Sequence, residues 1–164
     1  MATKLFVTEE EGTPLRACSD LVEIRTEERL QFIDLTALVA ERVRRSGVWQ
    51  GLVCVQSLHT TAAITLNENE PLLVEDMKAL LERWAPRDAP YGHNATHREA
   101  KDPSARESEN GDSHCRALLL GASETLTVVQ GALQLGTWQS LFLVELDGPR
   151  KRSLSLVVLG TRRP

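Results

Sequence analysis

The stretch Gly51–Glu70, GLVCVQSLHTTAAITLNENE, places polar side chains at the junction of two apolar runs. The first run, Leu52–Leu58, and the second, Ala62–Leu66, have the apolar and β-branched residues that are typical of buried strands. His59 and two threonines lie between them, where packing alone gives no reason for an imidazole. We therefore predict two strands whose connection belongs to a functional site.

Three histidines far apart in the chain, His59, His93 and His114, are the candidate metal ligands. A neutral imidazole binds a divalent metal, and three of them plus a water molecule form a common catalytic zinc site. We expect the fold to gather these rings around a divalent metal, with zinc as the candidate. His97 follows His93 by four residues, but segment 87–110 shows no helical period, so this pair is not interpreted as a zinc-binding helix. A hydrogen-bonded structural role is the alternative for each histidine.

Length and charge restrict the class of protein. A chain of 164 residues fits a single domain spanning 1–164, and its net charge of −4 gives no reason to expect nucleic-acid binding. No apolar run reaches the roughly 18 residues of a membrane helix, and no signal-peptide pattern opens the chain, so we expect a cytoplasmic protein without a membrane partner. Three cysteines without CxxC spacing argue against a disulfide framework.

Apolar residues at helical spacing predict two amphipathic helices. Leu35, Leu38, Val39 and Val43 form one apolar face that ends before Gly47. A second helix begins at Pro71 and ends before Pro86, and its apolar face, which includes a methionine and a tryptophan interpreted as core, consists of Leu73, Met77, Leu80, Leu81 and Trp84. A shorter helix at 112–120 ends at Gly121.

The remaining regular segments are predicted strands: Lys4–Thr8, Leu21–Arg25, Glu124–Val129, Thr137–Asp147 and Arg152–Leu159. Asp147-Gly148-Pro149 predicts a tight hairpin turn between the last two. Strands, then helices, then hairpin-linked strands indicate an α+β fold: a single domain with a large mixed, mostly antiparallel sheet and a few helices.

Six short blocks follow one another along the chain: HTTA (His59–Ala62), NENE (Asn67–Glu70), YGH (Tyr91–His93), DSH (Asp112–His114), LGTWQ (Leu135–Gln139) and ELDGPR (Glu145–Arg150). In this order and spacing they resemble the YjbQ-like family, also called the secondary thiamine-phosphate synthase family. The resemblance implies an α+β homotrimer with a pocket near a subunit interface that holds His59, His93 and His114. It also implies bound metal or anion in some members and a weak thiamine-phosphate synthase activity. The long insert at 97–109 departs from the family pattern.

Four further residues are candidates for this site. Glu68 is the candidate general base or fourth ligand, and a charge at a helix N-terminus is its alternative role. Arg150 is the candidate that grips a substrate phosphate, because a guanidinium matches phosphate oxygens in bidentate fashion; a surface turn is the alternative. Trp138 and Gln139 are candidates for lining the cofactor or substrate pocket, and a core position is the alternative for the tryptophan.

Three functions remain open from the sequence. The first is an enzyme that joins a pyrimidine diphosphate to a thiazole phosphate, where the departing pyrophosphate must be neutralised. The second is a histidine-metal-dependent hydrolase of a small phosphorylated or acyl substrate, with water activated by the metal. The third is a non-catalytic trimer that binds a small anion.

Overall fold

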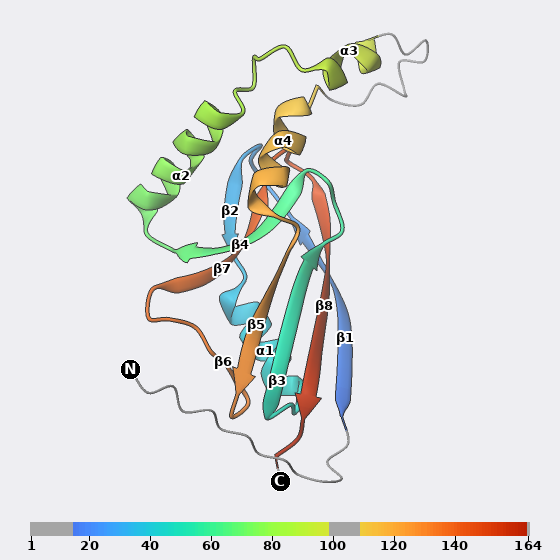
Figure 1. Cartoon of the computed structure of the whole chain (residues 1–164), viewed down its shortest axis with the longest axis vertical. Helices are drawn as coiled ribbons and strands as arrows, with labels where there is room; N and C mark the ends of the chain where they lie inside the picture. Colours follow the sequence, from blue (N-terminus) through green and yellow to red (C-terminus); the bar gives the residue numbers. More distant parts are fainter. Residues whose placement is uncertain (1–14, 99–108, 164) are drawn as a thin grey trace, which may run out of the picture.

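Two antiparallel sheets face each other in the computed structural model, which describes residues 15–98 and 109–163. The predicted strand Lys4–Thr8 lies outside these residues. The five-stranded sheet has the order β1-β8-β3-β5-β6 and the three-stranded sheet the order β2-β7-β4 (Figure 1). The strands are β1 Arg16–Arg25, β2 Gln31–Asp34, β3 Gln50–Ser57, β4 Ala62–Glu68, β5 Ser123–Val129, β6 Ala132–Leu133, β7 Gln139–Glu145 and β8 Lys151–Thr161.

The α+β class is confirmed, but the sheet differs from the prediction in one respect. Strand pairs among the described residues are all antiparallel, and they divide into two sheets instead of one mixed sheet. Helix α1, Thr36–Ser46, closes one end of the space between the sheets with Leu35, Val39 and Val43 in the main core. It ends at Gly47 in the left-handed region, with φ 69°, as the sequence predicts.

Helices α2, Pro71–Trp84, and α4, Gly111–Leu120, cover the other face of the three-stranded sheet (Figure 1). A second core cluster forms there from β4, β7 and α2, with Ala117 and Leu120 of α4 against it. Trp84 is 59% exposed, so its predicted core role is wrong. Leu81 is the buried residue of α2, and Trp84 lies with Glu82 and Arg83 on the side of the last turn that faces solvent. None of the described helices is long and apolar enough to cross a membrane.

The two connections that the sequence singled out both cross between the sheets. Strand β7 pairs with β2 on one edge and with β4 on the other, so it has no free edge for β8, which pairs with β1 and β3 instead. The predicted hairpin at Asp147-Gly148-Pro149 is therefore wrong. The β3–β4 connection, which carries His59, is likewise a crossover. Because Ala62 stands opposite Glu145 and Ser57 opposite Leu154, both crossovers lie at the same end of the molecule.

Segment 87–110, predicted to lack regular structure, contains helix α3, Gly92–Arg98. The helix places positions 93 and 97 one turn apart, although the side chain of His97 is outside the described part of the chain. Seven residues are too few to produce a readable helical period, which is why the sequence did not reveal this element.

Candidate functional site

A buried ion pair lies where the two crossovers meet. Glu145 is 0% and Arg152 2% exposed, and Arg152 Nε donates a hydrogen bond to Glu145 Oε2 at 2.6 Å. The Thr26 hydroxyl and the two main-chain N–H groups that follow Glu145 also donate to its carboxylate, at 2.9, 2.9 and 2.7 Å. Arg152 Nη2 donates to the carbonyl and hydroxyl oxygens of Thr61, both at 3.1 Å. The pair therefore ties both sheets and the β3–β4 crossover together.

The carboxylate of Glu145 stays charged despite its burial. Burial alone would raise the pKa of Glu145, but the hydrogen bonds from Arg152, from the Asp147 N–H and from the Thr26 hydroxyl outweigh it. These donors hold the pKa of the carboxyl below its ordinary value. A charge buried at the junction of the sheets is thus stabilised by donors that the fold supplies.

His59 takes the place of a main-chain acceptor at the end of β3. Its Nε2 accepts a hydrogen bond from the Ser153 N–H at 2.7 Å, one residue beyond the last β3–β8 pair. The acceptor nitrogen carries no proton, so the neutral ring is assigned its proton on Nδ1. Burial lowers the pKa of His59, and the charge of Arg152 lowers it further. In this arrangement neither ring nitrogen is open to a metal, and metal binding by His59 stays a prediction.

His93 and His114 lie against each other. Their ring centroids are 4.8 Å apart and the rings cross at 74°, with one ring on α3 and the other on α4. The two helices are joined by the buried Asn94, whose Oδ1 accepts from the Gly111 N–H at 2.9 Å. A Cβ on Gly111 would approach Tyr91 Cβ to 2.5 Å, so glycine permits this contact. The fold therefore brings two of the three predicted metal ligands together.

His59, the third predicted ligand, does not form a metal site with His93 and His114 within the described part of this chain. Among residues 15–98 and 109–163, no group of three or more His, Cys, Asp or Glu side chains is arranged to hold a metal ion. Two of the three predicted rings therefore lie together, at the contact of α3 with α4, and metal binding by any of the three stays a prediction.

A cluster of arginines and aspartates holds the start of α4 below the histidine pair. Arg29 donates to Asp112 at 3.0 Å and to Asp147 at 3.3 Å, which links α4 to the β7–β8 crossover. Arg116 lies 3.5 Å from Asp112 and donates to the carbonyl of Ala85 at the end of α2. Asp112 is 0% and Arg116 2% exposed, so this cluster fixes the position of the helix that carries His114.

Arg150 faces its own loop. Its Nε donates to the Asp147 carbonyl and its Nη2 to the Asp147 carboxylate, each at 2.7 Å. The Arg150 N–H donates to the Thr26 hydroxyl at 2.8 Å. The guanidinium remains 44% exposed at the same end of the molecule as the histidine pair, and its contact with a phosphate stays a prediction.

Glu68, Trp138 and Gln139 lie elsewhere. Glu68 stands opposite Gln139 at one end of the β4–β7 pair, whereas Ala62 stands opposite Glu145 at the other. Six residues along a strand span about 20 Å, so one protomer does not bring this group to the histidines. Trp138 is 71% exposed, and Gln139 Oε1 accepts from the Gly136 N–H at 2.8 Å. Their predicted roles in catalysis and cofactor binding are not tested by these positions.

The buried ion pair of Glu145 with Arg152 and the partly buried charge of Arg29 were not predicted from the sequence. Glu145 and Arg152 each occupy an inward position of a strand whose other inward residues are apolar, such as Leu143 and Leu154. A charged residue in register with a buried face is an available signal, because an unpaired charge there would be costly. Arg29 lies in a charged stretch without periodicity, and nothing in the sequence distinguishes it from a surface residue.

Comparisons with known proteins give a consistent result. Residues 20–161 match the family model described as UPF0047 protein YjbQ-like. A UPF0047 protein of Methanothermobacter thermautotrophicus is 44% identical over 149 residues, which cover 91% of this chain and 96% of that protein. The UPF0047 protein YugU of Bacillus subtilis is 32% identical over 85% of this chain and 97% of its own length.

Solved structures agree with the sequence relatives. A YbjQ-like protein of unknown function from Sulfolobus solfataricus superposes with a TM-score of 0.81 at 32% identity, covering 90% of this chain and 99% of that one. A hypothetical protein from Aeropyrum pernix gives a TM-score of 0.77 at 36% identity over 87% of this chain and 98% of its own. The family resemblance inferred from the six sequence blocks is confirmed, and the chain belongs to the YjbQ-like UPF0047 family, whose function is not known.

Proposed function

We propose that this protein is a small-molecule enzyme in which His93 and His114 bind a divalent metal beside a phosphorylated substrate. The observation that carries the proposal is the contact of these two rings, whose centroids are 4.8 Å apart although 21 positions separate the residues in the chain. The proposed reaction is the joining of a pyrimidine diphosphate to a thiazole phosphate, as the thiamine-phosphate synthase resemblance implies.

The donor set fits a transition metal. Imidazole nitrogens suit zinc and its first-row neighbours, whereas Mg²⁺ favours oxygen ligands. Two protein ligands leave coordination positions for a further ligand, for water and for a phosphate oxygen. When bound, such an ion would neutralise the charge that develops on a departing pyrophosphate.

The surrounding residues keep the two imidazoles in place. Arg29 and Arg116 hold Asp112 in the first turn of α4, two residues before His114, and Asn94 ties the start of α4 to α3. Because the two helices are already fixed, the rings of His93 and His114 lose less conformational entropy when they bind an ion. Arg150, partly exposed at the same end, is the proposed phosphate contact, which requires its guanidinium to share or leave Asp147.

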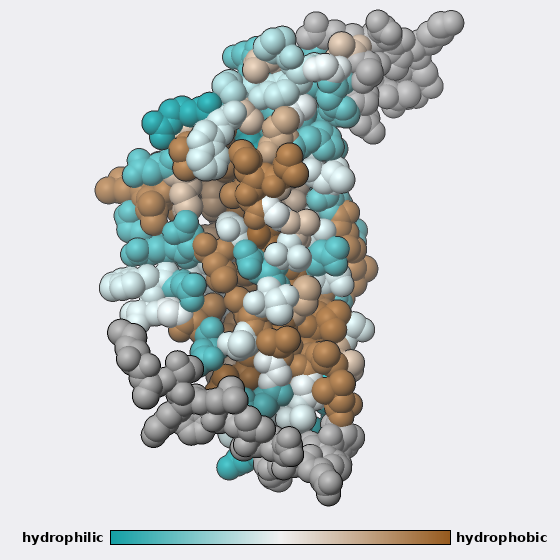
Figure 2. Space-filling view, viewed as in Figure 1, coloured by the Kyte–Doolittle hydropathy of each residue, from teal (hydrophilic) through white to brown (hydrophobic). Residues whose placement is uncertain are grey.

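We also infer that the protein forms a homotrimer, in which a further ligand reaches the histidine pair from a neighbouring copy. The sequence-based reason for a trimer, the apolar run Leu141–Val144, does not hold, because these residues are 0–1% exposed within the protomer. Support comes instead from the outward face of the five-stranded sheet, where hydrophobic side chains gather (Figure 2). Leu21, Leu52, Val157 and Leu159 are 61, 45, 36 and 40% exposed on that face. Sedimentation that gives a monomer at micromolar concentration would contradict the trimer.

Product identity tests the proposed reaction. The full chain, loaded with zinc or manganese, is incubated with the pyrimidine diphosphate and the thiazole phosphate, and thiamine phosphate and pyrophosphate are quantified together. We expect equal amounts of the two products, lost with a chelator and reduced at least tenfold in His93→Ala and His114→Ala, but unchanged in the exposed control Arg44→Gln. Release of inorganic phosphate from either substrate alone would show that the protein is a hydrolase and not a synthase. Metal-dependent binding of a substrate without any product would show that it is a non-catalytic anion-binding protein.

A further inference from the structure

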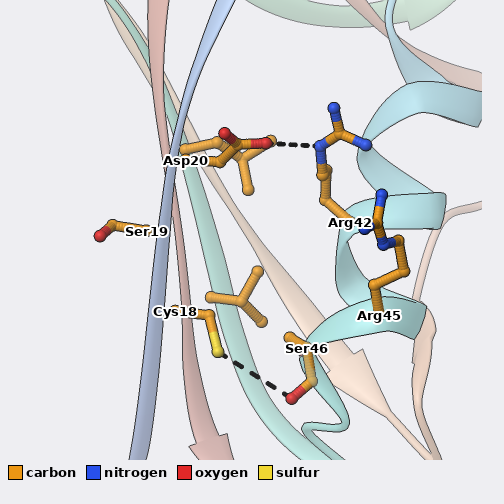
Figure 3. A pocket seen from close by; sticks show the side chains of 8 residues that line it. Cys18, Ser19, Asp20, Arg42, Arg45 and Ser46 are labelled. Carbon is orange, nitrogen blue, oxygen red and sulfur yellow. Dashed lines mark hydrogen bonds and ion pairs between the residues drawn. The ribbon is translucent and has the colours of Figure 1, made fainter.

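A cavity of about 430 Å³ opens between β1 and α1, at the end of the molecule away from α3 and α4 (Figures 1 and 3). Its volume falls in the range of small-molecule sites, about 300–1,000 Å³. Neither the histidine pair nor the buried charges of the two crossovers take part in it. The lining residues are Cys18, Ser19, Asp20, Arg42, Arg45, Ser46, Leu156 and Val158.

The base of the cavity is apolar and its α1 side is cationic. Leu156 and Val158 of β8 are 2% and 1% exposed, and they stand opposite Asp20 and Cys18 of β1. Arg42 Nε donates to Asp20 at 2.5 Å, which anchors that guanidinium at the rim (Figure 3). The apolar base and the cationic side are therefore within one small space.

Two guanidiniums and one carboxylate give the lining a net positive charge. Arg42 uses its Nε for Asp20, and the guanidinium of Arg45 makes no hydrogen bond or ion pair with any residue that the structure describes. The α1 C-terminus, which has a partial negative charge, opposes an anion here, but Arg44 and Arg45 in its last turn offset that charge. An incoming anion would find N–H donors that the fold leaves available.

We propose that this cavity binds a small organic acid, with its carboxylate on Arg45 and Arg42 and its short apolar body on Leu156 and Val158. Charge-assisted hydrogen bonds to the carboxylate supply the specificity and most of the affinity, because Leu156 and Val158, 2% and 1% exposed, leave the apolar body little protein surface to cover. An uncharged molecule of the same shape would bury the same surface without the ionic bonds. The proposal is independent of the metal and of the reaction at the histidine pair.

Cys18 reports occupancy directly, because its partly buried thiol lies in the cavity wall, whereas Cys115 on α4 is exposed and remote. The full chain is alkylated with iodoacetamide over a concentration series of hexanoate, and the two cysteines are followed separately by peptide mass spectrometry. We expect saturable protection of Cys18 and none of Cys115. Hexanamide, the uncharged analogue, should protect Cys18 at least tenfold less effectively.

Two substitutions in α1 test whether the hexanoate carboxylate binds to Arg45. Arg45→Gln should raise the half-protecting hexanoate concentration about tenfold, because a charge-assisted bond is lost. Arg44→Gln removes a neighbouring charge that pairs with Glu41 and does not line the cavity, so it should leave protection unchanged. Absence of protection, equal protection by hexanamide, or equal effects of the two variants would each overturn the proposal.

Discussion

Replacing Glu145 by Gln tests how the fold holds together at the site. The amide has the same shape, but one of its two polar ends is an NH₂ group, and every group around this carboxylate is a donor. If NH₂ takes the Oε2 position it faces Arg152 Nε, and if it takes the Oε1 position it faces the N–H groups of residues 146 and 147. Either orientation sets donor against donor and leaves the charge of Arg152 without its partner.

The expected loss of stability follows from burial. Glu145 and Arg152 are 0% and 2% exposed, so neither water nor salt compensates the unpaired guanidinium. Breaking a buried pair by neutralising one partner costs about 3–5 kcal/mol. The exposed pair of Glu41 with Arg44, on α1, supplies the matched control: Glu41→Gln should change the free energy of unfolding by less than about 1 kcal/mol.

The difference in the free energy of unfolding between wild type and Glu145→Gln should depend on pH in a defined direction. The pKa of Glu145 is lowered from its ordinary value of 4.5, so the unfolded chain binds the proton more readily than the folded chain. The contribution of this carboxylate is therefore complete above the unfolded pKa and is lost as pH falls through the folded pKa. Urea unfolding at pH 7 and across the acid range should show the gap between wild type and Glu145→Gln narrowing as pH falls below about 4.5. A cost below about 1 kcal/mol at pH 7, or a gap that does not change with pH, would refute this reasoning.

Further predictions concern the two crossovers. His59→Ala leaves the Ser153 N–H without its acceptor and should cost about 1–2 kcal/mol in urea unfolding. Because the pKa of His59 is lowered, the unfolded chain binds more protons, so wild-type stability should rise with pH up to about 6.5; the slope should be smaller in His59→Ala, and an unchanged slope would contradict the assignment. Gly148→Ala would bring a Cβ against the Glu28 carbonyl oxygen and to 2.7 Å from Glu145 Cγ, so it should lower the melting temperature clearly. Gly92→Ala, whose Cβ would meet nothing within 4 Å, should not.

The local elements of this fold could be predicted because their signals are local. Val39 and Val43 at helical spacing, followed by Gly47, determine α1 within one short segment. The alternation of Leu154, Leu156 and Val158 with partly or fully exposed neighbours identifies β8 in the same way. Neither conclusion requires knowledge of any other part of the chain.

The pairing of the strands could not be predicted by the same means. Asp147-Gly148 is a common hairpin sequence, yet β7 already has partners on both edges, and those partners, β2 and β4, lie about 80–110 positions upstream. The sequence identified His93 and His114 as candidates by residue type. Their contact could not be predicted, because it depends on the short helix α3. The ion pair of Glu145 with Arg152 depends on where the two sheets meet, which no local pattern encodes.

Zinc titration of the metal-free full chain tests the central claim, that His93 and His114 bind a divalent metal. Wild type should bind zinc saturably, and His93→Ala and His114→Ala should each lower the affinity at least tenfold, because each removes an inner ligand, while Arg44→Gln should not change it. If His59→Ala also lowers the affinity, His59 would be the third predicted ligand, and its ring would have to give up the hydrogen bond from the Ser153 N–H. No saturable binding by wild type, or wild-type affinity in either His93→Ala or His114→Ala, would contradict the account.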